Sequence, residues 1–399
     1  MRLTRYPCFW IALACASLQA QPEPRDWTDD KGRKLAGTYL SATDTTVEIR
    51  RADGKSFTIP RATLSTDDNH YIDETRAKTS APGKKHNPML AGYDGTTTNF
   101  NDPWPESTSY EGDAPITVIE EVPAEHRFIY ESPHFRFQSN VVLRPSLISK
   151  VATMFEACYE LHRKVPFNNR RTRSPEAGKF NAKLFETPEE YYSAGGAPGT
   201  SGFYFGRTDE FIVPLTSLGV QKVGNGYMFD FKGDNQVMFH EITHQLWADL
   251  NEYAGTWMAE GFAEFMSTAP YRNGRFSLTQ QPGAALEYAT AYGKGNHGGR
   301  ALGKDIRMPR LQTLMTMTQA EFYQNPNANY GYGLLLVYYF IYLDEGNDSS
   351  RFKDCIRALQ DGKDASAARA VLLGGRSWEQ LEADVALKFR AKGIRIKFQ

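Results

Sequence analysis

The chain has 399 residues, of which 41% are hydrophobic and 23% are charged. This is the composition of a globular protein, and the length allows two domains or one large core with an appendage. Lys and Arg number 46 against 47 Asp and Glu, so the formal net charge is −1. Such near-neutrality excludes the strongly basic surface of a general nucleic-acid binder and offers no polybasic patch for a membrane.

The first twenty residues have the pattern of a secretory signal peptide. Two arginines precede a short apolar run over residues 7–17, and the small residue Ala20 lies just before polar sequence. We therefore predict a signal peptide over residues 1–20 and an exported chain, whether secreted, periplasmic or in the cell envelope. A lipoprotein attached through Cys15 is the alternative, although Ala12 stands where such proteins usually carry Leu. No later run is long enough for a transmembrane segment, because the longest apolar stretch has ten residues.

Residues 21–75 are predicted to form a small all-β domain. Residues 46–50 alternate between apolar and polar side chains, residues 52–55 form a turn, and residues 57–60 return as the second strand of a hairpin. With Trp27, the Ala-Asp-Gly-Lys turn and Leu64, this region resembles the SH3-like barrel called the Sla homology domain. The resemblance implies a barrel of a family whose members can bind short peptides, although no particular site residue here marks such a site, and the alternative is a packing or spacer module.

Residues 76–113 are predicted to be a flexible linker. They are rich in Lys, Gly, Pro, Ser, Thr, Asn and Asp and contain few branched apolar residues, which indicates a largely disordered segment. Tyr93, Trp104 and Tyr110 are the residues expected to dock parts of this linker onto a neighbour.

Residues 114–399 are predicted to be an α+β domain, because strands come first and helices follow. Strands are predicted over residues 128–130, 134–137, 179–185, 202–205 and 210–214, the last two as a hairpin. Helices are predicted over residues 146–165, 187–192, 234–250, 257–268 and 331–345. Cys158 and Cys355 both lie in helical sequence, and in an oxidising compartment we expect either one disulfide or two buried thiols.

The stretch His240-Glu241-Ile242-Thr243-His244 lies in the helix predicted over residues 234–250, with Asp234 as its N-cap. Residues four apart share one face of a helix, so both imidazoles can bind one metal ion. Glu241 lies about 100° around the same helix, beside that ion.

Two carboxylates of the next predicted helix extend this group. Glu260 supplies a third ligand, and two His with one Glu is a ligand set that holds catalytic zinc and leaves one position open for water. Glu264 follows one turn later on the same face. We expect it to hydrogen-bond the outer nitrogen of His240 or His244, the alternative being an exposed helix carboxylate.

These residues resemble the gluzincin metallopeptidases. His240-Glu241-x-x-His244-Gln245 followed by Trp257-x-x-Glu260-Gly261-Phe262-Ala263 is similar to the aminopeptidase N branch and, more closely, to peptidase-MA-like bacterial domains of unknown function. The resemblance implies one Zn²⁺ per chain on His240, His244 and Glu260, with Glu241 as general base. Ala259 replaces the Asn often found before the ligand Glu, and the Gly-Ala-Met-Glu-Asn segment of the aminopeptidases is absent. We therefore expect an endopeptidase more than an aminopeptidase.

Peptide hydrolysis also needs a hydrogen-bond donor for the oxyanion. Residues 329–333, Asn-Tyr-Gly-Tyr-Gly, precede a predicted apolar helix and resemble the Tyr-x-x-Gly segment that supplies this donor in gluzincins. Tyr330 matches by position and is assigned a catalytic role, with Tyr332 as second candidate. The alternative is that these tyrosines only pack, as others on the same helix are expected to do.

The sequence thus predicts an exported zinc metallopeptidase that acts on a peptide or protein substrate. The strand over residues 202–205 can pair with an extended substrate by strand addition, or it is an ordinary internal hairpin. The alternative function is a non-catalytic envelope protein, in which the small barrel binds a peptide or protein partner and the metal site is structural or vestigial.

Overall fold

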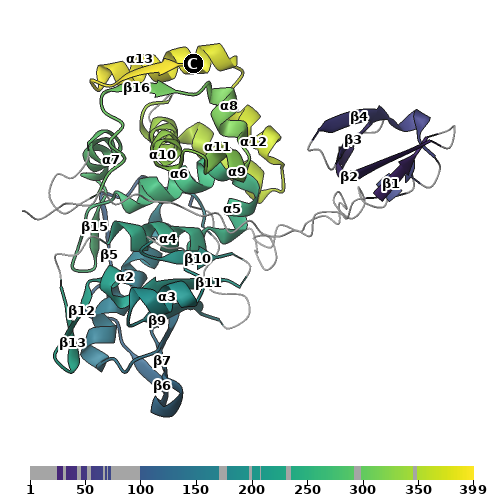
Figure 1. Ribbon diagram of the computed structural model, residues 1–399. Helices are drawn as coiled ribbons and strands as arrows, with labels where there is room; N and C mark the ends of the chain where they lie inside the picture. The colour runs from purple at the N-terminus through teal and green to yellow at the C-terminus, as the bar shows by residue number, and fades with distance from the viewer. Residues whose placement is uncertain are drawn as a thin grey trace, which may run out of the picture. The chain divides into compact units, whose positions relative to one another are not determined.

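The structure, a computed structural model, describes residues 25–29, 33–42, 46–51, 55–65, 68–69, 71–72, 99–169, 178–196, 200–206, 208–230, 235–291, 298–344 and 348–399 (Figure 1). The predicted signal peptide and residues 76–98 of the predicted linker lie outside the described residues. The chain divides into two compact units, Cys15–His86 and a larger one that includes Asn87–Gln399. Among the described helices, none combines the length and hydropathy needed to cross a membrane.

The smaller unit contains one antiparallel sheet of four strands. Strands β1 (Arg25–Thr28), β2 (Lys34–Ala42), β3 (Thr46–Arg50) and β4 (Ser56–Pro60) pair in chain order. Alternate residues of β3, Val47 and Ile49, are buried against Trp27 and Tyr39, as the period-two pattern predicts.

The predicted all-β unit is therefore confirmed as a small antiparallel sheet, but a closed barrel is not found. Within the described residues β1 and β4 remain the two edges of the sheet, because the four-residue β1 pairs only with β2. Near the sheet, a single bridge joins Asp29 to Leu64.

The first half of the larger unit is a six-stranded sheet. Its order is β10-β11-β9-β8-β7-β6, and β9 pairs in parallel with both β8 and β11. The strands are β6 (Thr117–Val122), β7 (Arg127–Glu131), β8 (Phe135–Ser139), β9 (Phe180–Phe185), β10 (Phe203–Phe205) and β11 (Glu210–Pro214). Five of these strands lie where the sequence predicts them, and β6 is an additional edge strand.

Helix α2 (Pro145–Lys164) packs on this sheet. The ring of Phe155 lies 5.1 to 5.8 Å from the rings of Phe135 and Phe137 on β8 and of Phe211 on β11. The short α3 (Pro188–Ser193) begins with a capping box of Thr187 and Glu190.

The remaining strands form smaller sheets: β5 (Ser107–Ser109), β12 (Val220–Val223), β13 (Gly226–Phe229), β14 (Tyr271–Arg272), β15 (Arg275–Ser277), β16 (Asp305–Met308) and β17 (Arg395–Phe398).

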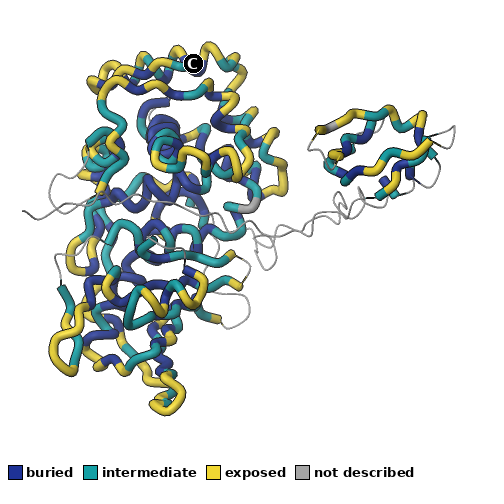
Figure 2. Tube along the Cα trace, viewed as in Figure 1, coloured by how far each residue is buried: buried dark blue, intermediate teal, exposed yellow. Residues whose placement is uncertain are grey.

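The second half of the larger unit is mainly helical, so a mixed α+β class is confirmed. Its helices are α4 (Gln236–Leu246), α5 (Ala248–Ala254), α6 (Thr256–Ser267), α7 (Gln281–Thr290), α8 (Leu311–Thr316), α9 (Gln319–Phe322), α10 (Pro326–Tyr342), α11 (Ser350–Gln360), α12 (Ala365–Leu373) and α13 (Trp378–Ala391). Figure 2 shows buried residues running through the interior of this half, along α6 and α10. Cys158 and Cys355 are both free and buried, which matches the two-thiol alternative.

Two predicted helix boundaries are wrong. The helix predicted over residues 234–250 is interrupted at Trp247, which joins α4 to α5 with φ −115° and whose buried indole N–H donates to His162. Asp234, its predicted N-cap, lies outside the described residues. The helix predicted to begin at residue 331 begins at Pro326, a favourable first helical residue, so Tyr330 lies inside α10 and not before it.

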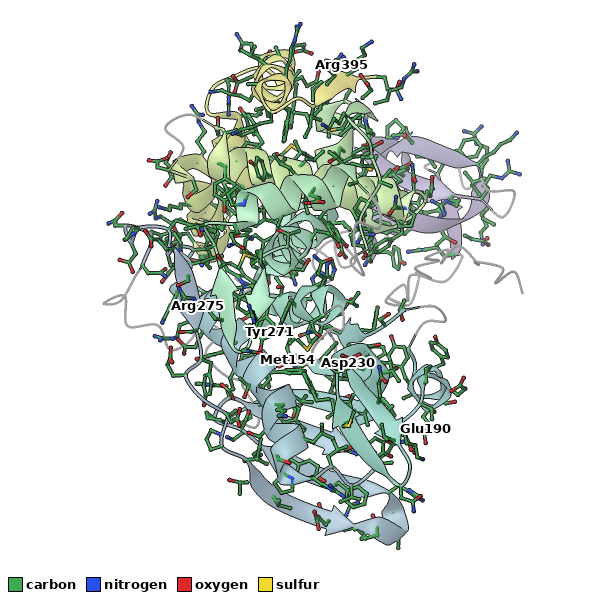
Figure 3. All side chains as sticks on the ribbon, turned by 90° about the vertical axis from the view of Figure 1, so that its left-hand side faces the viewer. Met154, Glu190, Asp230, Tyr271, Arg275 and Arg395 are labelled. Carbon is green, nitrogen blue, oxygen red and sulfur yellow. The ribbon has the colours of Figure 1, made fainter. Side chains whose placement is uncertain are left out.

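The predicted linker is wrong for residues 99–113, which belong to the larger unit. Phe100 is buried, and Trp104 makes edge-to-face contacts at 5.4 to 6.3 Å with Phe167, Phe265 and Tyr342. Strand β5 pairs with β15 in a three-stranded sheet, located in Figure 3 by the labels of Tyr271 and Arg275. As the sequence predicts, Trp104 and Tyr110 dock this segment onto the larger unit, while Tyr93 lies outside the described residues. Strand β5 is not predicted, because its partner strand lies far along the chain.

Helices α6 and α10 cross at two glycines. A Cβ atom on Gly261 would lie 2.5 Å from the carbonyl carbon and oxygen of Gly333, and one on Gly333 would lie 2.8 Å from the carbonyl oxygen of Trp257. The two backbones therefore touch directly. Because Glu260 precedes Gly261 and Tyr330 lies one turn before Gly333, this crossing sets how α6 and α10 present their polar side chains.

Candidate metal centre

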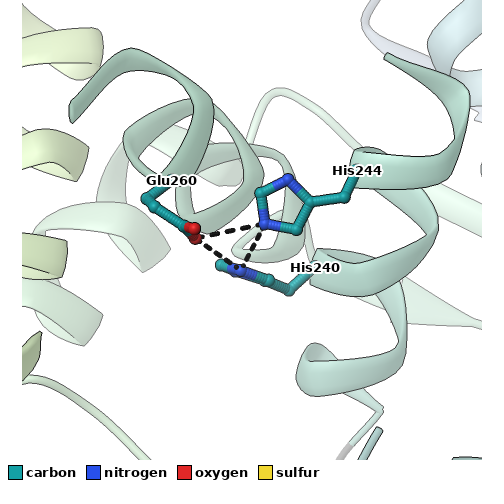
Figure 4. Close-up of side chains that lie close together, drawn as sticks. All are labelled: His240, His244 and Glu260. Carbon is teal, nitrogen blue, oxygen red and sulfur yellow. Dashed lines mark hydrogen bonds and ion pairs between the residues drawn. The ribbon is translucent and has the colours of Figure 1, made fainter. Parts of the chain in front are cut away.

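His240, His244 and Glu260 meet where α4 packs against α6 (Figure 4). The two Nε2 atoms lie 3.0 Å apart. Glu260 Oε2 lies 3.2 Å from Nε2 of His240 and 3.1 Å from Nε2 of His244. The side chains of all three residues are at most 13% exposed, so the three atoms form a compact and largely buried triangle.

This triangle is close to, and slightly smaller than, the size of a tetrahedral metal site. Ligand atoms about 2.0–2.2 Å from a tetrahedral ion lie roughly 3.3–3.6 Å from one another, close to the 3.0 to 3.2 Å seen between these atoms. Two imidazole nitrogens that face each other cannot both carry a proton, whereas a cation between them and the carboxylate satisfies all three. The three residues thus form a candidate metal-binding group, as the sequence predicts.

The outer nitrogen of His240 faces a second carboxylate. Its Nδ1 lies 3.0 Å from Oε1 of Glu264, which is buried and not exposed on the helix surface. Burial opposes the charged form of His240, but Glu260 and Glu264 outweigh it and raise the imidazole pKa to about 10. Metal binding at this group must therefore displace a proton.

The other two residues of the triangle also have partners outside it. Oε1 of Glu260 accepts a hydrogen bond of 2.6 Å from the hydroxyl of Tyr323, which lies just after α9. Burial opposes ionisation of Glu260, but the two imidazoles hold its pKa well below the usual range. Nδ1 of His244 lies 3.3 Å from the side-chain amide of Asn251 on α5.

Glu241 lies beside the triangle and contacts the six-stranded sheet. Its Oε2 accepts a 3.1 Å hydrogen bond from the backbone N–H of Tyr204 on β10. Burial raises the pKa of Glu241, the charges of His240 and His244 oppose that rise, and Glu260 adds to it. Within the described residues β10 pairs only with β11, so β10 is an edge strand of the sheet. This strand, predicted over residues 202–205, therefore lies next to the Glu241 carboxylate.

The two candidate tyrosines of α10 have different surroundings. The ring of Tyr330 lies 5.8 Å from the ring of His240, and burial together with the charge of Glu260 raises its pKa well above the usual value. Tyr332 instead donates a 2.8 Å hydrogen bond to the carbonyl of Arg307, on β16. The structure therefore brings Tyr330 to the metal-binding group and leaves Tyr332 engaged elsewhere.

Three neighbours of the group are not identified by the sequence analysis: Asn251, Arg300 and Tyr323. Arg300 donates to both oxygens of Glu264, at 2.8 and 2.5 Å. Arg300 and Tyr323 are contributed by segments 40 or more residues from His244, and no local pattern marks any of the three. The only related sequence signal is the Thr318-x-x-Glu321 capping box, which indicates the start of α9 before Tyr323.

Comparisons of the chain with protein-family models, with curated proteins and with solved structures found no match.

Proposed function

We propose that the larger unit is a zinc-dependent peptide hydrolase of the gluzincin type, and that the chain is exported to act on a peptide or protein substrate. One observation carries this proposal: three ligand atoms of His240, His244 and Glu260 lie within 3.2 Å of one another, and Glu241 follows His240 on α4. Two imidazoles and one carboxylate are a ligand set of catalytic zinc sites, which keep a fourth position open.

Glu241 is suited to act as the general base. Zinc held by this set would supply a water of lowered pKa and polarise the substrate carbonyl. Burial raises the pKa of this carboxylate and so makes it a stronger base, which can accept a proton from the water and return it to the departing amine. Oε2 of Glu241 accepts a hydrogen bond from the Tyr204 N–H, so Oε1 is the oxygen that we propose accepts the proton.

Tyr330 is suited to donate a hydrogen bond to the developing oxyanion. Its pKa is raised well above the usual value, so its hydroxyl keeps its proton throughout the neutral range. A protonated donor in a buried site stabilises negative charge more strongly than it would in water. Tyr332 is not proposed for this role, because its hydroxyl is engaged by Arg307.

The position of β10 supports an extended peptide as substrate. The N–H of Tyr204 donates to Glu241, so the edge of β10 that pairs with no other described strand faces the proposed base. An extended chain can add to such an edge through backbone hydrogen bonds. Together with the absence of an aminopeptidase clamp segment from the sequence, this favours cleavage within a peptide over removal of its first residue.

For the smaller unit we propose an SH3-like module that binds a short peptide. It is supported by the pairing order of β1 to β4 and by an aromatic cluster in which the guanidinium carbon of Arg25 lies 3.8 Å from the ring centroid of Tyr71. The effect of removing this unit on cleavage of protein and of peptide substrates tests whether it recruits a partner.

The variant Glu241→Gln tests the proposed hydrolase. Wild type should contain one zinc per chain by elemental analysis and should cleave members of a peptide library. The variant should keep its zinc and lose roughly 10²- to 10⁴-fold in kcat. Glu189→Gln, which changes an exposed helix carboxylate, is the matched control and should behave as wild type.

Two results would contradict the proposal. A wild-type protein that binds no zinc would exclude the metal centre. A zinc-loaded protein that hydrolyses no peptide would favour the alternative, a non-catalytic envelope protein with a structural metal site.

A further inference from the structure

We infer that Arg300 is a positioning residue that holds the metal ligand His240 and the proposed oxyanion donor Tyr330 in one fixed arrangement. This inference rests on the proposed function, but its metal-binding part is measurable without hydrolysis. Arg300 lies between α7 and β16, and its own backbone is fixed. Its N–H donates to the carbonyl of Tyr288 at 2.8 Å, and its carbonyl accepts from the side chain of Asn327 at 2.8 Å.

The first contact of Arg300 reaches His240 through Glu264. Nε donates to Oε2 of Glu264 at 2.8 Å and Nη2 donates to Oε1 at 2.5 Å, with side-chain exposures of 15% for Arg300 and 3% for Glu264. The same Oε1 lies 3.0 Å from Nδ1 of His240. A two-point pair fixes the carboxylate, and a fixed carboxylate on the outer nitrogen orients the imidazole that binds the metal.

The second contact of Arg300 is with Tyr330. The guanidinium carbon lies 4.6 Å from the centroid of the Tyr330 ring, within the range of a cation–π interaction. Gly331 makes this approach possible, because a Cβ there would lie 2.7 Å from Leu302 Cδ1 and 3.1 Å from Arg300 Cβ. One side chain therefore touches the partner of a metal ligand with its nitrogens and the proposed oxyanion donor with its face.

This role differs from simple neutralisation of the Glu264 charge. A lysine at position 300 keeps the positive charge, but it lacks the planar fork that pairs with a carboxylate and stacks on a ring. If Arg300 only neutralises charge, Arg300→Lys should keep the zinc affinity and the Co²⁺ spectrum of wild type. If Arg300 positions its neighbours, Arg300→Lys should change both.

The metal-binding test uses Arg300→Lys, Glu264→Gln and the double variant. We expect Arg300→Lys to lower zinc affinity about 10- to 100-fold, measured by competition with a chromophoric chelator. The visible absorption bands of the Co²⁺-loaded variant should also shift, since the imidazole of His240 is reoriented. Because Arg300 acts through the Glu264 carboxylate, the double variant should bind zinc no more weakly than Glu264→Gln alone.

The second test concerns Tyr330 and uses zinc-saturated protein. Arg300→Lys should lower kcat more than it changes KM. In a Tyr330→Phe background the same substitution should lower kcat by a smaller factor, because the part of its effect that acts through Tyr330 is already lost and only the part through Glu264 and His240 remains.

The control variant is Arg351→Lys, which weakens a comparable ion pair of 2.8 Å with the buried Asp344 outside the metal-binding group. Circular dichroism checks that every variant is folded. A folded Arg300→Lys protein with wild-type zinc affinity and an unchanged Co²⁺ spectrum would overturn the inference. A wild type that binds no zinc would overturn both the inference and the proposed function. Zinc binding without hydrolysis would overturn the proposed function alone, and the metal-binding test would still decide the role of Arg300.

Discussion

Replacing Gly261 by alanine tests whether the contact between α6 and α10 fixes both the stability of the larger unit and its metal centre. The added Cβ would lie 2.5 Å from the carbonyl carbon and oxygen of Gly333 and 2.8 Å from its Cα. Non-bonded carbon atoms attract best at about 3.5–4.0 Å. The two helices must therefore separate by roughly 1 Å, because all three obstructing atoms belong to the backbone and no side chain can turn away.

The expected cost follows from overpacking. An added methyl group in a well-packed interior typically costs about 1–3 kcal/mol, and this contact against backbone belongs at the upper end. The better helix propensity of alanine offsets up to about 1 kcal/mol of this cost, so the free energy of unfolding should fall by roughly 1–2 kcal/mol. In a unit of this size, that loss lowers the Tm by about 2–8 °C.

The metal centre should weaken as well. Glu260 adjoins Gly261, and a displacement of about 1 Å exceeds the roughly 0.2 Å tolerance of metal–ligand distances. We therefore expect zinc affinity to fall together with Tm. Thermal unfolding by circular dichroism and zinc competition with a chelator measure the two effects in one set of samples.

Gly283→Ala is the matched control. Gly283 also lies in a helix, α7, but apart from its own helix backbone and chain neighbours no described atom lies within 4 Å of its added Cβ. This variant should lose no stability and should gain up to about 1 kcal/mol. If Gly261→Ala were as stable as Gly283→Ala and bound zinc as tightly as wild type, the close crossing would not hold the site together.

Three further predictions concern contacts away from that crossing. Tyr323→Phe removes the 2.6 Å hydrogen bond to Glu260 and should lower zinc affinity about 10-fold or more in a folded protein, so an unchanged competition curve would contradict its role. Burial lowers the pKa of His162 to about 3, while the unfolded chain binds a proton near 6.5. Metal-free protein should therefore lose stability as pH falls from 6.5 toward 3. In His162→Gln the urea midpoint should depend less on pH across that window, and a pH dependence equal to that of wild type would refute this prediction. A chain that starts at residue 99 should unfold at the wild-type denaturant midpoint of the larger unit. One that starts at residue 114 lacks β5 and Trp104 and should unfold earlier, and equal midpoints would show that residues 99–113 contribute nothing.

The sequence predicts the parts of the fold in which the local pattern is strong. Helix α2 has a regular apolar face and lies within one residue of its predicted range. The strands from β7 to β11 also lie close to their predicted positions, because alternation and turn residues act over a few neighbouring positions. The break at Trp247 could not be predicted in this way, since it depends on a hydrogen bond to His162, 85 residues earlier in the chain.

By itself, the sequence determined that His240 and His244 share one helix face, because that follows from the 3.6-residue period alone. It also determined that Glu260 and Glu264 lie one turn apart on a following helix. Only the tertiary structure decided that Glu264 faces His240, that Tyr323 and Arg300 complete the surroundings, and that Tyr330 approaches the site while Tyr332 does not. The physical reason is that periodicity tells which face of an element is buried but not which distant segment covers it. Here the covering segments are set by the backbone contact of Gly261 with Gly333, two glycines 72 residues apart that carry no local signal of their meeting.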